Sequence, residues 1–301
     1  CHRFLLRSIQ SHVVRGYVGN KCSVFPLQLL GFDVDPVNSV QFSNHTGMAD
    51  EGWYSSFTGE ILQGDQLTSL VDGLERNSLL DGYTHMLTGY IGSPSFLRAV
   101  IGVFHKLKEV NSGLRFVCDP VLGDGGRLYV PEGNVDIYRN EVLPIATVIT
   151  PNQFEAELLS GVEIRTEDDA CRACAALHEK GPETVVITSC TLEDQGDDIF
   201  LFASICKNGK NGEGGQGNVT GSRTGAMTGR MNDEGDGESR VPPLLELYKM
   251  TFPRIPQTFT GTGDLMASLL LAWMHTLPND FPGALERVGG TLQAVLARTH
   301  I

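Results

Sequence analysis

The string Gly261-Thr262-Gly263-Asp264 stands directly before an apolar run over residues 265–273. The run predicts a buried helix and is too short to span a membrane. A Gly-Thr-Gly turn at the helix start leaves backbone N–H groups at the positive end of the helix dipole, where anions bind. If the anion is a phosphoryl group in transfer, these N–H groups stabilise its charge and Asp264 accepts the proton of the attacking hydroxyl. The string therefore indicates an enzyme that phosphorylates a small molecule, with a simple helix cap as the alternative.

Length and composition limit the class of protein. A chain of 301 residues can bury one large core, so we expect a single domain over residues 1–301. No stretch of 18 apolar residues is present, which predicts that the protein has no membrane partner. Acidic residues outnumber basic ones 36 to 23, a balance that argues against a nucleic-acid partner. It does not argue against ATP, whose phosphates are held by local helix N-termini and metal ions.

The seven cysteines are an odd number scattered along a long chain, which predicts reduced thiols rather than a disulfide framework. Cys171 and Cys174 form a Cys-x-x-Cys pair inside a predicted helix that is capped by Thr166. A zinc site would need a second pair of ligands, so we interpret this pair as structural. With no secretory signal pattern at the N-terminus, these features lead us to expect a cytoplasmic protein.

Short apolar or β-branched runs alternate with longer helical patterns along the chain. This alternation predicts a three-layer α/β/α fold with a mainly parallel central sheet and helices on both faces. The predicted strands cover residues 4–9, 36–40, 84–87, 114–118, 147–149, 184–187, 199–205 and 248–252. The predicted helices cover residues 19–30, 65–77, 94–110, 153–159, 168–180, 264–275 and 283–298.

Polar side chains follow six of the predicted strands. Ligands of such sheets bind beyond the carboxyl ends of the strands, so these side chains predict one shared site. Each residue alone is equally well explained as part of a turn or a helix cap. The side chains are Ser11 and His12, then Ser39, Gln41, Asn44 and Thr46, then Thr88 and Tyr90, then Asp119 and Asp124, then Thr150, Asn152 and Glu155, and last Thr188 and Ser189.

Residues 207–240 contain ten glycines and almost no large apolar side chains. Such a segment cannot pack a core, and we expect it to be a disordered insertion in the single domain. The chain has no Gly-x-x-x-x-Gly-Lys-Ser/Thr string, which excludes a P-loop nucleotide site.

Five strings together resemble the pyridoxal kinase family, which belongs to the ribokinase-like superfamily. The resemblance spans about residues 5–206 and 248–300, and the two N-terminal strings are specific to this branch of the superfamily. The strings cover residues 8–20, 37–47, 118–124, 149–157 and 261–264.

The resemblance implies transfer of the γ-phosphoryl group of ATP to the 5'-hydroxyl of pyridoxal, with pyridoxine and pyridoxamine as further substrates. It implies that Asp264 is the general base, that the amides of Gly261, Thr262 and Gly263 form the anion hole, and that the protein is a homodimer. Ser11 and Thr46 would bind the ring substituents of the vitamer. The ring would pack near Val18, Val40, Phe42 and Tyr90, with Tyr129 closing over it.

The same resemblance implies a site for ATP and its cations. ATP would meet Asp119, Asn152, Glu155, Thr188, Ser189 and Thr262. Mg²⁺ prefers a few carboxylates plus phosphate oxygens, which suits Asp119, Asp124 and Glu155. Thr150 would also lie at the metal site, and Thr188 with backbone carbonyls would hold a monovalent cation, K⁺ or Na⁺.

Two departures and two alternatives stand beside this interpretation. Residues 48–59 form a longer stretch than the family pattern has after His45-Thr46-Gly47, and the insertion lies where the family has a flap over ATP.

A hydroxymethylpyrimidine kinase shares the superfamily site and also phosphorylates a hydroxymethyl group on a heteroaromatic ring. A non-catalytic vitamer-binding protein on the same scaffold is the alternative from another class.

Overall fold

A nine-stranded sheet runs through the centre of the computed structural model, which describes residues 4–46, 54–193, 195–207 and 244–299. The strand order is β11-β10-β9-β8-β5-β4-β1-β2-β3. The six strands from β9 to β2 in this order pair in parallel, whereas β3, β10 and β11 join antiparallel. The strands are β1 (Phe4–Val13), β2 (Phe32–Phe42), β3 (Gly59–Ile61), β4 (Tyr83–Thr88), β5 (Arg115–Cys118), β8 (Val148–Ile149), β9 (Thr184–Cys190), β10 (Ile199–Lys207) and β11 (Leu244–Phe252).

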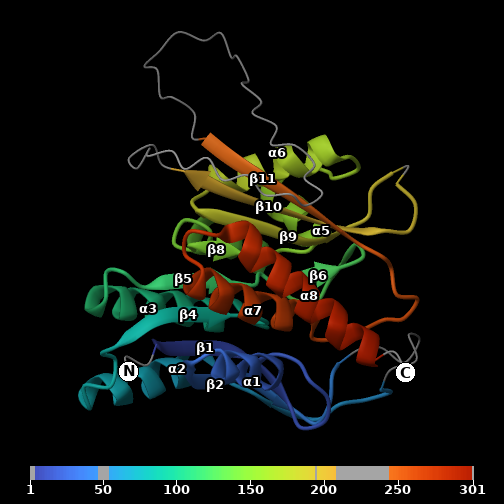
Figure 1. The fold of residues 1–301 in the computed structure, drawn as a ribbon. Coiled ribbons are helices and arrows are strands. Elements are labelled where there is room, and N and C mark those ends of the chain that lie inside the picture. The colour runs from blue at the N-terminus through green and yellow to red at the C-terminus, as the bar shows by residue number, and fades with distance from the viewer. Residues whose placement is uncertain (1–3, 47–53, 194, 208–243, 300–301) are drawn as a thin grey trace.

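Helices cover both faces of this sheet. Apolar residues of α1, α7 and α8 form one core cluster with the sheet, and those of α2 to α6 form the other. Figure 1 shows α7 and α8 crossing the front of the sheet. The helices are α1 (Asn20–Leu29), α2 (Gly64–Arg76), α3 (Pro94–Val110), α4 (Gly133–Ile137), α5 (Gln153–Ser160), α6 (Glu167–His178), α7 (Thr262–Thr276) and α8 (Phe281–Thr299).

Neighbouring residues of the central strands enter opposite cores. Met86 and Phe116 lie in the cluster with α3, while Leu87 and Val117 lie in the cluster with α7. A side chain on each face of a strand is therefore buried, which is why these strands have nearly continuous apolar sequences. The predicted three-layer α/β/α arrangement with a mainly parallel sheet is confirmed.

All of the predicted strands and helices are present, with ends that differ by a few residues. The strand predicted over residues 4–9 continues to Val13, so Ser11 and His12 lie inside β1 and do not follow it. In the same way Gln41 lies inside β2, Thr88 inside β4, and Thr188 and Ser189 inside β9, while Ser39 lies within the part of β2 that was predicted. Pairing with neighbouring strands extends these elements past residues that have weak strand propensity.

Five short elements are absent from the sequence-based prediction. They are β3, the hairpin of β6 (Gly123–Asp124) and β7 (Arg127–Leu128), α4, and a π-helix over Tyr138–Val142. Each has five residues or fewer, too short for a hydrophobic period to be recognised. The predicted disorder of 207–240 concerns a segment that, from residue 208 on, lies outside the described residues. In the described part of the chain, no helix combines the length and apolarity that crossing a bilayer requires.

His85 on β4 lies in an aromatic cluster between the sheet and the last turn of α7. Its side chain is buried, and its ring centroid lies 5.2 Å from that of Phe32 and 4.8 Å from that of His275. The Nδ1 atom contacts the hydroxyl of Thr84, and Nε2 is buried without a hydrogen-bond partner. Burial, together with the charges of His275 and Arg115, lowers the pKa of His85 to about 3.

This depressed pKa predicts acid sensitivity. An unfolded His85 takes up a proton near pH 6.5, whereas the folded protein resists protonation down to about pH 3. The stability that neutral His85 contributes is therefore complete above pH 6.5 and is lost as the pH falls, by up to about 1.4 kcal/mol per pH unit. We expect His85→Phe to lose less free energy of unfolding than the wild type between pH 6.5 and 5, measured by urea titration. The control His105→Phe, at an exposed position on α3, should follow the wild type. Parallel pH curves for wild type and His85→Phe would contradict this assignment.

Candidate active site

The turn before α7 has the geometry that its glycines allow. Gly261 has a φ of 78°, a conformation that residues with a side chain rarely adopt. A Cβ atom there would lie 2.2 Å from the backbone oxygen of Tyr17, so only glycine fits against the loop that precedes α1. The first bond within α7 runs from the Leu265 N–H to the Gly261 oxygen, which leaves the N–H groups of Thr262 and Gly263 ahead of it. This arrangement presents a helix N-terminus suited to an anion.

Asp264, in the first turn of α7, is held by the start of α1. The backbone N–H of Gly19 donates to its Oδ2 at 2.7 Å, and the hydroxyl of Ser23 donates to its backbone oxygen at 3.1 Å. Burial raises the pKa of Asp264, and the hydrogen bond from Gly19 acts in the opposite direction. One oxygen of this carboxylate is thus engaged by a backbone donor at the start of α1.

Gly19 also packs against Ser11, so Ser11 lies close to Asp264. A Cβ atom on Gly19 would lie 2.0 Å from the backbone oxygen of Ser11 and 2.5 Å from its hydroxyl oxygen. Ser11 and Asp264 therefore flank one glycine, although they lie at opposite ends of the sequence. The residue type of Gly19 does not indicate this role, because a backbone N–H carries no side-chain signature.

A small apolar cluster adjoins this point. It contains four of the residues that the family resemblance assigns to the vitamer ring, together with Val13. The hydroxyl of Ser39 donates to the backbone oxygen of Tyr90 at 2.9 Å and fixes that residue against β2. The structure thus brings together Val18, Val40, Phe42 and Tyr90.

Thr46 and Tyr129 are not part of that cluster. Thr46 is exposed and is the last described residue before the gap at 47–53. Tyr129 is 55% exposed, and its N–H donates to the Leu122 oxygen just after the β6–β7 hairpin. Their roles toward the vitamer remain predictions.

Asp119 lies at the carboxyl end of β5, close to the start of α7. Its Oδ2 lies 3.3 Å from where a Cβ of Gly263 would be, and the side chain is 5% exposed. Burial and the nearby carboxyl groups of Glu155 and Asp264 raise the pKa of Asp119. The adjacent Thr150 hydroxyl lowers it slightly, yet that hydroxyl is itself buried and lacks a partner at full hydrogen-bond geometry. A buried carboxyl and an unsatisfied hydroxyl together suit a cation.

Glu155 has both carboxylate oxygens occupied by backbone N–H groups. Oε1 accepts from Leu122 at 2.9 Å and Gly123 at 3.3 Å, and Oε2 accepts from Asn152 at 2.9 Å. Asn152 in turn accepts from the N–H of Glu155, so the pair forms a capping box at the start of α5. The Asn-x-x-Glu spacing is itself the sequence signal for this arrangement, in agreement with helix capping as the alternative role of these residues.

Asp124 is exposed in the β6–β7 hairpin, where its Oδ1 accepts the N–H of Gly125 at 2.7 Å. Its charge acts on Glu155, whose pKa it raises, and Glu155 in turn raises the pKa of Asp119. Within the described ranges, no group of three or more His, Cys, Asp or Glu side chains is arranged to hold a metal ion.

Thr188 connects β9 to the loop that carries Thr150. Its N–H and its hydroxyl both donate to the Pro151 oxygen, at 2.9 and 3.4 Å. Ser189 follows it as an exposed residue of the same strand. Thr150, Asn152 and Thr188 therefore lie on adjoining segments, as the sequence analysis expects for an ATP-side surface.

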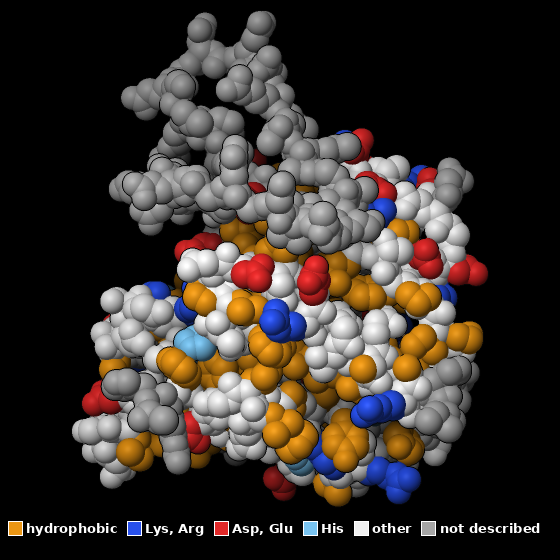
Figure 2. All heavy atoms as spheres, viewed as in Figure 1, with side chains coloured by type: hydrophobic (Ala, Val, Ile, Leu, Met, Phe, Trp, Pro, Cys, Tyr) orange, Lys and Arg blue, Asp and Glu red, His pale blue; other side chains and the backbone are white. Residues whose placement is uncertain are grey.

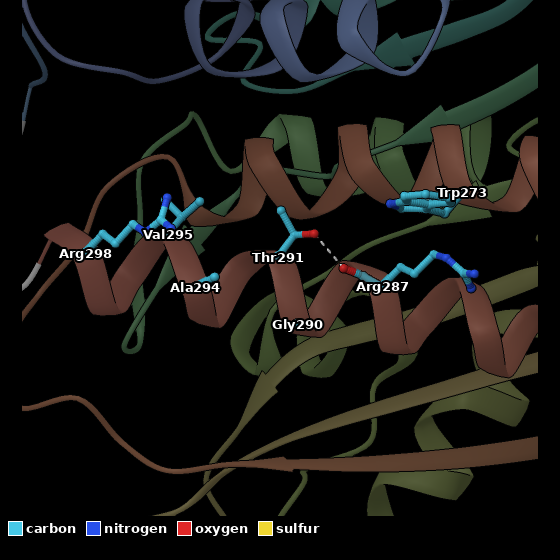
Figure 3. Close-up of a pocket in the computed structure, with 7 residues that line it drawn as sticks. All are labelled: Trp273, Arg287, Gly290, Thr291, Ala294, Val295 and Arg298. Atoms are coloured by element: carbon cyan, nitrogen blue, oxygen red, sulfur yellow. Dashed lines mark hydrogen bonds between the residues drawn. The ribbon is translucent and has the colours of Figure 1, made fainter.

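A separate groove of about 520 Å³ lies between the second half of α7 and α8. Figure 3 shows Trp273 on α7 facing Arg287 on α8, with Arg298 further along α8. The guanidinium carbon of Arg287 lies 5.0 Å from the centre of the Trp273 ring. None of the predicted site residues lines this groove.

Comparison with known proteins agrees with this geometry. The family model described as "Phosphomethylpyrimidine kinase" matches residues 81–222. A pyridoxal kinase of Arabidopsis thaliana is 49% identical over 97% of this chain and 81% of its own, and one of Homo sapiens is 43% identical over 97% and 84%. The solved structure of pyridoxal kinase from Leishmania donovani in complex with ADP and pyridoxamine superposes with a TM-score of 0.79 at 34% identity, covering 97% of this chain and 89% of that one.

Proposed function

This chain belongs to the pyridoxal kinase family, with its ribokinase-like fold, and we propose that it phosphorylates the 5'-hydroxyl of pyridoxal with ATP. Pyridoxine and pyridoxamine, which carry the same hydroxymethyl group, are the expected further substrates. The observation that supports the proposal best is the position of Asp264. Its carboxylate lies in the first turn of α7, beside Gly19, and Gly19 itself packs against Ser11.

The reaction needs a base, an in-line acceptor and stabilisation of phosphoryl charge. We assign the base to Asp264, whose Oδ1 takes the proton as the 5'-oxygen attacks the γ-phosphorus and the bond to ADP breaks. The N–H groups of Thr262 and Gly263 face the transferring oxygens at the positive end of α7. The apolar cluster around Val18 and Phe42 packs the ring and excludes water.

On the nucleotide side, the proposal places Mg²⁺ near Asp119 and the Thr150 hydroxyl. Bound Mg²⁺ would neutralise charge on the ATP phosphates, whose oxygens supply most of its ligands. Glu155 supports this site indirectly, because its carboxylate fixes the backbone of residues 122 and 123. We also propose that a monovalent cation binds near Thr188 and the Pro151 carbonyl.

We also propose a homodimer and a cytoplasmic location. Large apolar side chains are exposed on α1 and the loop before it, namely Tyr17 at 70%, Phe25 at 66% and Leu29 at 70%. Figure 2 shows hydrophobic side chains gathered on the lower part of this face, where α1 lies in Figure 1. An exposed apolar patch of this kind suits a twofold contact with a second copy of the chain. The described cysteines are all free, as expected in a reducing compartment.

Parallel assays of ATP turnover with pyridoxal and with hydroxymethylpyrimidine test the proposed function. The partial match to the phosphomethylpyrimidine kinase model makes the pyrimidine the relevant competitor. We expect kcat/KM to be higher for pyridoxal than for hydroxymethylpyrimidine, and we expect pyridoxal 5'-phosphate to form. Faster turnover of the pyrimidine would reverse the substrate assignment, and tight vitamer binding without turnover would indicate a binding protein.

Ser11→Ala and Thr46→Ala should each raise KM for pyridoxal more than KM for ATP. Each variant removes one neutral hydrogen bond to the vitamer, worth about 0.5–1.5 kcal/mol, or roughly a twofold to twelvefold rise in KM. Steady-state kinetics with each substrate varied in turn measure the two constants. Thr68→Ala on α2, whose hydroxyl bonds the Gly64 oxygen, serves as the control and should change neither. A larger effect on KM for ATP would show that the two halves of the cleft are assigned in reverse.

A further inference from the structure

The first residue of α1, Asn20, is 2% exposed and bonded to both neighbouring strands. Its Nδ2 donates to the Val37 oxygen at 2.8 Å and to Oδ1 of Asn38 at 2.9 Å, both on β2. A longer contact of 3.4 Å reaches the Gln10 oxygen on β1. The amide of one side chain thus connects the start of α1 to two strands of the sheet.

A second layer of hydrogen bonds orients this amide. The buried hydroxyl of Ser8 donates to Oδ1 of Asn20 at 2.7 Å, and Nε2 of Gln10 donates to the Ser8 hydroxyl at 2.9 Å. Ser8 and Gln10 are at most 1% exposed. Because donors and acceptors of the Asn20 amide are satisfied on both sides, its orientation is fixed.

The start of α1 has no side-chain cap; this network fixes it to the sheet, while Cys22 and Ser23 bond it to the start of α7. Gly19, immediately before Asn20, donates its N–H to Oδ2 of Asp264 at 2.7 Å. That bond is the interaction that lowers the pKa of the Asp264 carboxyl against the effect of burial. A shift of α1 would therefore move the Gly19 N–H away from the Asp264 carboxylate.

We propose that Asn20 is a positioning residue for the catalytic base: it fixes the first turn of α1 on β1 and β2 so that the Gly19 N–H stays aimed at Asp264. The proposal rests on the proposed function, in which Asp264 takes the proton of the substrate hydroxyl. Asn20 touches neither the reacting atoms nor Asp264, and it acts only through the backbone of Gly19.

The test compares Asn20→Ala with Asn111→Ala in the full chain. Asn111 at the end of α3 is a matched control, because its amide also connects a helix end to a strand, donating to the Tyr83 oxygen at 2.9 Å. For Asn20→Ala we expect kcat to fall roughly tenfold to a hundredfold, since small displacements of a catalytic group have effects of this size. KM for ATP should stay unchanged, and the acidic limb of kcat should move to higher pH. Asn111→Ala should keep the wild-type kcat and pH profile.

A readout independent of turnover separates this proposal from the proposed function. The carboxyl ¹³C signal of Asp264, titrated by NMR, should show a raised pKa in Asn20→Ala and an unchanged one in Asn111→Ala. An inactive wild type with that pKa difference would refute the proposed reaction and leave the positioning intact. An unmoved Asp264 pKa, or equal kcat losses in both variants, would overturn the role of Asn20.

A milder variant decides the question if Asn20→Ala does not fold. Ser8→Ala removes the donor to Oδ1 of Asn20 and the acceptor of Nε2 of Gln10, and it leaves the bonds from the Asn20 amide to β2 in place. It should lower kcat in the same direction, by roughly threefold, and raise the Asp264 pKa by a smaller amount. Wild-type kcat and an unshifted carboxyl signal in folded Ser8→Ala would refute the proposal.

Discussion

Asp264→Asn lowers kcat by roughly a hundredfold or more, while pyridoxal still binds, because a base contributes to the transition state far more than to the ground state. The amide keeps the shape of the carboxylate and can still accept the Gly19 N–H, so the contact between α1 and α7 survives. What it loses is the ability to take a proton at Oδ1. Steady-state turnover and equilibrium binding of pyridoxal, measured on one preparation, separate the two effects.

Asp280→Asn provides the matched control for this variant. The carboxylate of Asp280 accepts the N–H of Gly283 at the start of α8, so it is a helix-capping Asp with no place in the proposed site. It should retain wild-type turnover. If Asp264→Asn also retained wild-type turnover, Asp264 would serve only as the acceptor that joins α7 to Gly19, and the proposed mechanism would be wrong.

Glu155→Ala should destabilise the fold by roughly 3–5 kcal/mol, because it leaves buried N–H groups without acceptors, each of which costs about 1–3 kcal/mol. Those groups belong to Leu122, Gly123 and Asn152, and Glu155 is itself 3% exposed. Burial raises the pKa of this carboxyl to about 8, whereas the three hydrogen bonds act to lower it. Urea unfolding without nucleotide measures the loss, so that nucleotide binding cannot obscure it.

Two further variants identify the origin of that loss. Glu155→Gln keeps one acceptor oxygen and should lose much less stability than the alanine variant. Glu157→Ala, two residues further along α5, loses a single acceptor for the Ile164 N–H and should cost about 1 kcal/mol. Equal stabilities of Glu155→Ala and Glu157→Ala would contradict a structural role. A Mg²⁺ affinity that falls in Glu155→Gln as far as in Asp119→Asn would instead support direct ligation by Glu155.

Local patterns were enough to predict the layers of the fold and the helix at Asp264. The apolar run after Gly263 can only be a helix buried in a core, and the central strands are apolar on both faces. The same patterns place Asp119 and Thr150 at strand ends, where the structure has them. The grouping of Val18, Val40 and Phe42 came from family resemblance, since nothing in their spacing indicates contact.

The features that the sequence did not predict depend on contacts between distant parts of the chain. Gly19 acts through its backbone N–H, which donates to Asp264. Asn20 acts through its side-chain amide, which donates to oxygens on two strands. The type of a residue predicts neither of these contacts. Glu155 is of a residue type that binds metal ions, but its Oε1 accepts the N–H groups of Leu122 and Gly123, which lie 33 and 32 residues earlier in the chain. Short elements such as α4 form because neighbouring segments hold them, so no local period predicts them.

The hydrogen bond between Gly19 and Asp264 joins residues 245 positions apart. Because α7 follows β11 in the chain, a nascent polypeptide emerging from the ribosome can complete every strand of the sheet before its base exists. Contacts of such long sequence separation form slowly, since closing the intervening chain costs entropy before the contact stabilises anything. Recovery of enzymatic activity during refolding therefore reports the docking of α1 on α7, a later event than the return of circular dichroism.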